Sequence, residues 1–369
     1  MEFIAIFLVL LLTIILLFAV RDIALKTGWV DHPGGRKQHA HPVPTIGGVA
    51  MFLGFCTAII FFSSAMSNAG VLLAASALLL VVGCYDDRRG LSARMRLLLQ
   101  LGCAALVVIE GDIILVNLGA VFYPGSIDLG AWAVPFTIFC IAGVINAMNM
   151  SDGLDGLAGG YALNTFLLLV IAAVQAGRIA DAQTLFVLIA VVSAFLLFNY
   201  RFPGRRHAML FMGDAGSMFL GLVLAWFLID LTQGADAAMS PVVSLWLFAI
   251  PLYDTVSVMV RRMVRGGSPF KADRAHIHHV LHAHGCSTLQ TTMILHTASL
   301  LLGSVGLALD YAGVSEYIMF WSLAGIFAVY CLVMSRAWTR AEILTTNAVI
   351  HVDSESESVK GADTQSEAA

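Results

Sequence analysis

The chain has 369 residues, of which 59% are hydrophobic and 12% are charged, and its formal net charge is −4. Soluble globular proteins carry about 25% charged residues, so this composition excludes an ordinary soluble domain and predicts an integral membrane protein. The small net charge says little about partners, and no nucleic-acid partner is expected.

Apolar segments recur along most of the chain. A transmembrane helix needs about 20 apolar residues, and we expect spans near residues 3–20, 46–63, 70–85, 97–113, 134–148, 159–176, 183–199, 216–232, 241–260, 290–309 and 318–335. The first segment follows only Glu2 and precedes Arg21 and Lys26, so we interpret it as a retained helix rather than a signal peptide. The predicted fold is an all-α polytopic membrane protein with about eleven transmembrane helices.

The positive charges indicate how these helices are oriented. All of the 20 Lys and Arg residues except Arg178 fall in alternate loops or after the last span. Because Lys and Arg gather in cytoplasmic loops, we expect a periplasmic N-terminus and a cytoplasmic C-terminus. Residues 1–344 form the expected membrane domain, and residues 345–369, rich in Ser and Glu, are predicted to be a disordered acidic cytoplasmic tail.

Four polar clusters all fall on the predicted cytoplasmic side. They are Asp86-Asp87, residues 146–156 with several Asn and Asp side chains, residues 211–217 around Asp214, and residues 276–279 with the sequence His-Ile-His-His. Each alone is explained by a helix cap, a solvated helix end or a basic loop. Together, carboxylates and cations at a membrane edge are typical of a functional site.

Oxygen ligands surrounded by cations suit a polyanion bound with Mg²⁺ or Mn²⁺. Phosphoryl transfer needs these parts, because the protein mainly positions phosphates and neutralises their charge. A site at the membrane edge further implies that one substrate is a lipid. A polytopic transporter is the distant alternative. A transporter is expected to show internal repeats, or broken helices with charges near the bilayer midplane.

These clusters, together with residues 28–33, 36–39, 47–48, 91–96 and 268–274, resemble the motifs of the polyprenyl-phosphate N-acetylhexosamine-1-phosphate transferase family. The resemblance runs from about Arg21 to Arg340. Within the family, the sequence resembles above all the bacterial branch that uses UDP-GlcNAc and undecaprenyl phosphate. The His-Ile-His-His form differs from the histidine motif of the peptidoglycan branch. The acidic tail has no counterpart in the family pattern.

The resemblance implies roles for individual residues. Asp86 and Asp87 match a catalytic pair, Asp152 and Asp155 match acids that complete the catalytic centre or bind the nucleotide, and Asp214, Asn149 and Asp87 match the ligands of Mg²⁺ or Mn²⁺. The residues that match substrate contacts are Asn146, Phe211 (stacking on uracil), His276, His278 and His279 (on the diphosphate or sugar), Lys37, His39 and Arg274.

The implied reaction transfers N-acetylglucosamine-1-phosphate from UDP-GlcNAc to undecaprenyl phosphate, with release of UMP. It would be the first membrane step of O-antigen or common-antigen synthesis, in the bacterial inner membrane with the site facing the cytoplasm. Another UDP-N-acetylhexosamine or UDP-MurNAc-pentapeptide is the alternative donor. Direct attack by the lipid phosphate, double displacement through an aspartyl phosphate, and a homodimer all stay open at this point.

Overall fold

The computed structural model describes residues 2–31, 42–62, 68–202, 204–205, 207–268 and 276–340. Its helices are α1 (Glu2–Thr27), α2 (Gly47–Phe62), α3 (Ala69–Arg89), α4 (Ala93–Glu110), α5 (Ala133–Ser151), α6 (Leu157–Gln175), α7 (Ile179–Asn199), α8 (Gly213–Asp230), α9 (Pro241–Leu247), α10 (Ala249–Val264), α11 (Ile277–Ala283), α12 (Thr288–Tyr311) and a last helix, Glu316–Arg340. A 3-10 turn, η1 (Gly130–Trp132), precedes α5, and two short antiparallel strands, β1 (Val30–Asp31) and β2 (Val43–Pro44), lie between α1 and α2.

The protein is a helical polytopic membrane protein. Within the described residues, eight helices are long and apolar enough to cross a membrane, and a ninth span is formed if α9 and α10 count together. Helices occupy all eleven predicted segments, while the number of spans and the orientation of the termini stay predictions. The expectation of one continuous helix over 241–260 was wrong, because the chain bends by 79° between α9 and α10.

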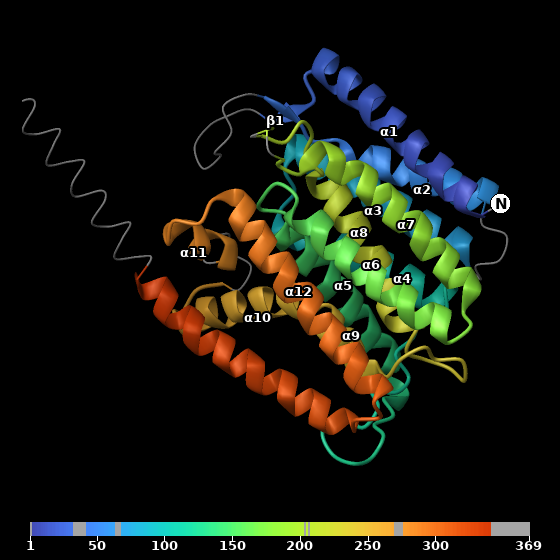
Figure 1. Cartoon of the computed structure of the whole chain (residues 1–369), viewed down its shortest axis with the longest axis vertical. Coiled ribbons are helices and arrows are strands. Elements are labelled where there is room, and N and C mark those ends of the chain that lie inside the picture. The colour runs from blue at the N-terminus through green and yellow to red at the C-terminus, as the bar shows by residue number, and fades with distance from the viewer. Residues whose placement is uncertain are drawn as a thin grey trace, which may run out of the picture.

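Helix α8 forms the centre of the bundle. Every residue from Ala215 to Ile229 is buried, as expected for a helix that is hydrophobic on all sides. Helices α2, α3, α5 and α6 pack around it (Figure 1). The position of the first turn of α8 is therefore fixed by several neighbours at once.

Two glycines let α2 and α3 approach this first turn closely. A Cβ atom on Gly83 would lie 2.2 Å from the Cα of Ala215, and one on Gly48 would lie 2.3 Å from the Cα of Gly216. Small residues commonly permit such contacts between helices in membranes. Because the opposing atoms belong to the backbone, no side-chain rotation can make room for a larger residue.

A separate corner is formed by α10, α11 and the last helix, which lie away from α1 and α2 in Figure 1. Val258 of α10, Val280 of α11, and Met334 and Trp338 of the last helix form their own hydrophobic cluster. The guanidinium of Arg261 lies 4.7 Å from the centre of the Trp338 ring. These contacts attach α11, which carries the histidine motif, to its two neighbours.

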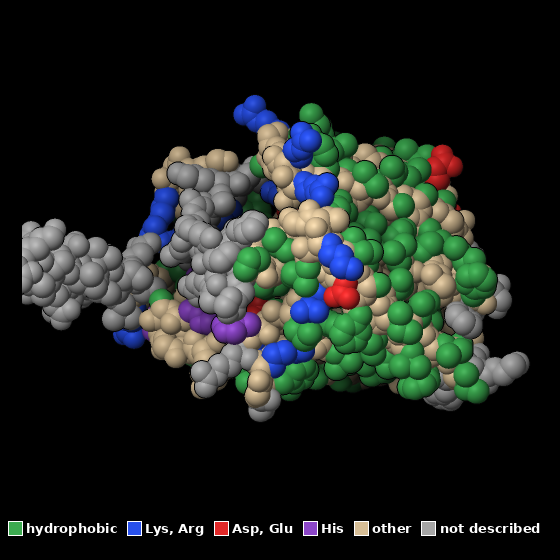
Figure 2. All heavy atoms as spheres, turned by 90° about the horizontal axis from the view of Figure 1, so that it is seen from above, with side chains coloured by type: hydrophobic (Ala, Val, Ile, Leu, Met, Phe, Trp, Pro, Cys, Tyr) green, Lys and Arg blue, Asp and Glu red, His purple; other side chains and the backbone are tan. Residues whose placement is uncertain are grey.

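Charged side chains are distributed unevenly over the surface. Figure 2 shows Lys, Arg and His side chains gathered over one part of the molecule, with hydrophobic side chains covering the flank beside them. Arg178, the exception in the loop pattern, donates to Asp181 at 2.7 Å and to Asp230 at 2.5 Å. It thus joins the start of α7 to the end of α8.

We expect Gly83→Ala to lower the thermal unfolding temperature of the detergent-purified protein, because the added methyl group meets backbone of α8. The free-energy cost should reach or exceed the roughly 1–3 kcal/mol typical of overpacking. Gly143→Ala on α5 is the matched control, since a Cβ there meets nothing within 4 Å. Equal unfolding temperatures for the two variants would contradict this packing.

Candidate active site

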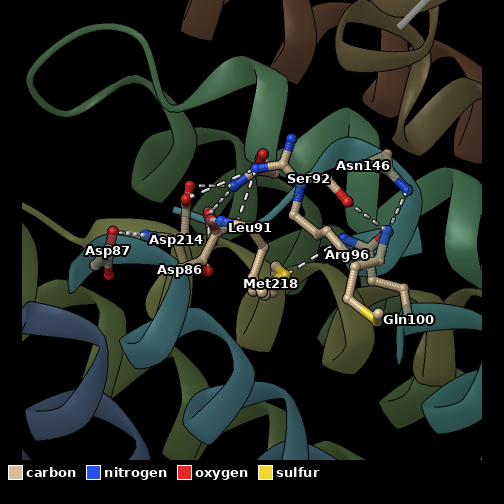
Figure 3. A network of polar contacts seen from close by, with 12 residues as sticks. Asp86, Asp87, Leu91, Ser92, Arg96, Gln100, Asn146, Asp214 and Met218 are labelled. Carbon is tan, nitrogen blue, oxygen red and sulfur yellow. Dashed lines mark hydrogen bonds and ion pairs between the residues drawn. The ribbon is translucent and has the colours of Figure 1, made fainter. Parts of the chain in front are cut away.

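Three helix ends meet at one place. The last turn of α3 carries Asp86 and Asp87, the last turn of α5 carries Asn149, and the first turn of α8 carries Asp214. Figure 3 shows Asp86, Asp87 and Asp214 close together and Arg96 of α4 directed toward them. One polar cluster is thus formed by five residues from four helices.

Asp87 caps α8 from another helix. Its Oδ1 accepts a hydrogen bond from the backbone N–H of Asp214 at 2.9 Å, and its Oδ2 lies 3.5 Å from the backbone nitrogen of Ala215. The N-cap residue of α8, Met212, offers no side-chain cap. The first N–H groups of a helix have no partner within it and carry partial positive charge, so a carboxylate is stabilised there.

The Asp214 carboxylate is held by two neighbours. Its Oδ1 accepts from Nδ2 of Asn149 at 2.7 Å, and its Oδ2 lies 3.8 Å from Nη1 of Arg96. The same Asn149 nitrogen lies 3.0 Å from the hydroxyl of Ser217, one turn further along α8. Asp214 and Asp87 therefore face a shared region from two different helices.

Asp86 has a different environment from Asp87. It is 8% exposed, its Oδ1 accepts from the backbone N–H of Leu91 at 2.6 Å, and its Oδ2 pairs with Nη1 of Arg96 at 3.0 Å. It closes the turn between α3 and α4 and holds Arg96 toward Asp214. The two adjacent aspartates are thus not equivalent.

Asp152 and Asp155 lie in the turn between α5 and α6. The pKa of Asp152 is raised to about 8 by its burial and by the negative charges of Asp214, Asp87 and Asp155. Asp155 accepts from Nε of Arg201 at 2.7 Å and from the backbone N–H of Ala208 at 3.3 Å. Asp155 therefore anchors the turn, while Asp152 lies close enough to Asp87 and Asp214 for their negative charges to repel its own.

The histidine motif reaches this same turn. A Cβ atom on Gly153 would lie 2.5 Å from Nε2 of His278, so the imidazole packs directly against that glycine. His278 is 2% exposed, and burial, with neighbouring His279 and His276, lowers its pKa well below the usual value. The His276 and His278 rings are stacked with centroids 5.7 Å apart, and the His279 ring centroid lies 4.2 Å from that of His278.

The remaining predicted residues lie in varied positions. Phe211 is half-buried, and its backbone N–H donates to the carbonyl of Pro44 at 2.8 Å. The amide of Asn146 donates to Gln100 at 2.6 Å, to one side of the carboxylates (Figure 3). Lys37, His39 and Arg274 lie outside the described residues.

The oxygen atoms of this cluster are of the kind that act as ligands of a divalent cation. Within the part of the chain that the structure describes, no three His, Cys, Asp or Glu side chains form a closed metal cage. Mg²⁺ is commonly held by only one or two carboxylates, together with substrate phosphates and water. Asp87 and Asp214 supply two carboxylates, and the Asn149 side chain contains an amide oxygen that can act as a further donor.

Asp254 of α10 was not predicted from the sequence to belong to the site. It is 4% exposed, and its Oδ2 lies 2.8 Å from Nδ1 of His276. The available signal was a lone carboxylate inside the apolar segment 241–260, because ionisable groups in such segments are costly and tend to be functional.

Comparison with known proteins identifies the family to which this chain is similar. The family model for glycosyl transferase family 4 matches residues 69–232, which include Asp86, Asp87, Asn149 and Asp214. The undecaprenyl-phosphate alpha-N-acetylglucosaminyl 1-phosphate transferase of Escherichia coli (strain K12) is 34% identical over 335 residues, covering 90% of this chain and 91% of that protein. Proteins of the same name from Yersinia pestis and Pasteurella multocida (strain Pm70) are 35% and 33% identical, covering 89% and 87% of this chain and 90% of each relative.

The family resemblance inferred from the motifs is therefore confirmed, since a relative that is 34% identical covers 90% of this chain and the family model matches residues 69–232. The chain belongs to glycosyl transferase family 4.

Proposed function

We propose that this chain transfers N-acetylglucosamine-1-phosphate from UDP-GlcNAc to undecaprenyl phosphate, releasing UMP and forming undecaprenyl-diphosphate-GlcNAc. The observation that carries the proposal is the meeting of Asp87, Asp214 and Arg96 at one end of the helix bundle. The name shared by relatives about 34% identical over 90% of the chain supports the choice of substrates.

The reaction brings two anions together. An oxygen of the lipid phosphate forms a bond to the phosphorus that carries the sugar, and the bond from that phosphorus to UMP breaks. The bond between the sugar and its phosphate oxygen is untouched, so the anomeric configuration is retained. A general base is not required, because a phosphate monoester with a second pKa of about 6 is largely ionised near pH 7.

The protein contributes charge and position to this step. Mg²⁺ held by Asp87 and Asp214 would neutralise diphosphate charge, and the Arg96 guanidinium adds a fixed positive charge. Asp86 orients Arg96 through the 3.0 Å ion pair, and Asn149 orients Asp214. Each group is thus placed before substrate arrives, which reduces the reorganisation needed during reaction.

We favour direct displacement over an aspartyl-phosphate intermediate. Both oxygens of Asp86 are occupied by Leu91 and Arg96, and Asp87 accepts from the backbone of α8. A carboxylate engaged in hydrogen bonds is a weaker nucleophile, because attack would require these bonds to weaken.

The location of the site completes the proposal. We propose that the chain lies in the bacterial inner membrane with this cluster at the cytoplasmic face, since the Lys and Arg residues gather in the loops at that end. The UDP-sugar would arrive from the cytoplasm and the lipid from the membrane. The product would start an O-antigen or common-antigen type glycan.

The first test is transfer of label from UDP-[¹⁴C]GlcNAc to undecaprenyl phosphate by membranes containing this chain. We expect lipid-linked label with Mg²⁺ and none with EDTA. Asp87→Asn and Asp214→Asn should each lower the rate by more than about a hundredfold, because the charged oxygens facing the diphosphate are lost.

Asp128→Asn is the matched control, because Asp128 lies in the loop between α4 and α5 and accepts from Asn117 instead. It should transfer label at the wild-type rate. Absence of transfer by wild-type protein from UDP-GlcNAc and from other UDP-amino sugars would refute the proposed reaction. Full activity of Asp87→Asn or Asp214→Asn would refute the assignment of the site.

The crowded carboxylates predict a pH effect on the metal-free protein. Folded Asp152 keeps its proton up to a pKa of about 8, while its ordinary value is 3.8. The folded state therefore binds more protons between these values, and its stability falls as the pH rises through this window. In EDTA, the unfolding temperature of wild type should fall more than that of Asp152→Asn between about pH 5 and about pH 8.5. Parallel curves would show that Asp152 is not in this environment.

A further inference from the structure

Asp254 is a buried acid for which the proposed reaction has no role so far. It lies on α10, the second half of the broken span, and is 4% exposed. A buried carboxylate is costly unless hydrogen bonds compensate the loss of water. Its partners therefore indicate what its charge does.

These partners come from two other elements. Oδ2 of Asp254 lies 2.8 Å from Nδ1 of His276, and Oδ1 accepts from the backbone N–H of Ile277 at 2.8 Å. The hydroxyl of Tyr330, on the last helix, lies 3.4 Å from the same Oδ1. One carboxylate thus holds both the start of α11 and the histidine that precedes it.

The contact with His276 also determines where that ring carries a proton. An ionised carboxylate only accepts hydrogen bonds, so Nδ1 of His276 must be the protonated donor. Nε2 is then the ring nitrogen left to contact a ligand. A hydrogen bond to the other ring nitrogen is a common means of fixing the tautomer and orientation of a functional histidine.

The His276 ring connects this contact to the carboxylate cluster. It stacks on His278 with an angle of 9° between the ring planes. His278 packs against Gly153, which follows Asp152. The Nδ1 atom of His278 is buried and has no hydrogen-bond partner among the described residues, so packing contacts, among them those with His276 and Gly153, hold this ring in place.

We propose that Asp254 is a positioning residue for the diphosphate-sugar site: it fixes the tautomer and the orientation of His276, and through the stacked rings the place of His278. This inference rests on the proposed transferase function. The competing explanation is a purely structural one, in which Asp254 only attaches α11 to α10. The two explanations differ in whether the effect of Asp254 depends on His276.

Asp254→Asn separates them with little change in shape. If the Asn oxygen faces the N–H of Ile277, its NH₂ group faces Nδ1 of His276, and the ring must shift its proton to Nε2. If the amide turns over, its NH₂ group opposes the N–H of Ile277 and the cap of α11 is lost. Either arrangement alters His276 or its support, while the hydrophobic cluster of Val258, Val280 and Trp338 remains.

We expect Asp254→Asn to lower kcat for transfer from UDP-GlcNAc by about ten- to a hundredfold, as when a carboxylate that orients a metal-bound histidine is removed. The decisive measurement is a double-mutant cycle with His276→Gln on purified protein. In the His276→Gln background, Asp254→Asn should cause little further loss of kcat, because the group through which it acts is already gone. Equal losses in both backgrounds, or wild-type kcat for Asp254→Asn, would overturn the proposal.

Two further variants keep the result interpretable. Asp181→Asn removes another buried carboxylate, which is paired with Arg178 at the start of α7. This variant should lower the unfolding temperature and leave kcat unchanged.

If Asp254→Asn does not fold, His276→Asn decides instead. Its amide can still donate a hydrogen bond to Asp254, but the shorter side chain has no atom in the place of Nε2. Loss of transfer by folded His276→Asn supports the proposal, and retained transfer overturns it. Failure of wild-type protein to transfer would count against the proposed function itself.

Discussion

The carboxylate of Asp87 accepts a hydrogen bond from the first turn of α8, and the arrangement of the site follows from this contact. Helix α8 is buried on all sides, and the backbone of its first turn lies against Gly48 and Gly83. The separation between Asp87 and Asp214 is therefore set by helix packing rather than by flexible loops. Such rigid support matters because phosphoryl transfer depends mainly on position and charge.

The same packing brings together carboxylates that repel one another. The raised pKa of Asp152 expresses this repulsion, since Asp214, Asp87 and Asp155 all contribute to it. Arg96 offsets part of the charge through Asp86 and Asp214. We propose that the remaining negative charge favours a divalent cation and, with that cation, a diphosphate. Repulsion among these carboxylates thus lowers the stability of the folded protein at the place where the proposed reaction needs a metal ion.

Much of this arrangement could be predicted from the sequence, because apolar runs determine helices and the polar clusters fall where those helices end. The break near Phe248 was missed although Pro251 provides a signal, since proline in the interior of a helix kinks or breaks it. The partners of individual carboxylates could not be predicted. Asp86 pairs with Arg96, and Asp254 with His276 across 22 residues of sequence, and such pairs depend on tertiary contacts that local patterns do not contain.

The most direct measurement of the central claim is a structure of the protein with Mn²⁺ and UDP-GlcNAc, in which anomalous scattering locates the metal. We expect one Mn²⁺ within coordination distance of carboxylate oxygens of both Asp87 and Asp214, with the diphosphate bound to it. A metal held only by the nucleotide, or bound at the histidines of α11, would contradict it.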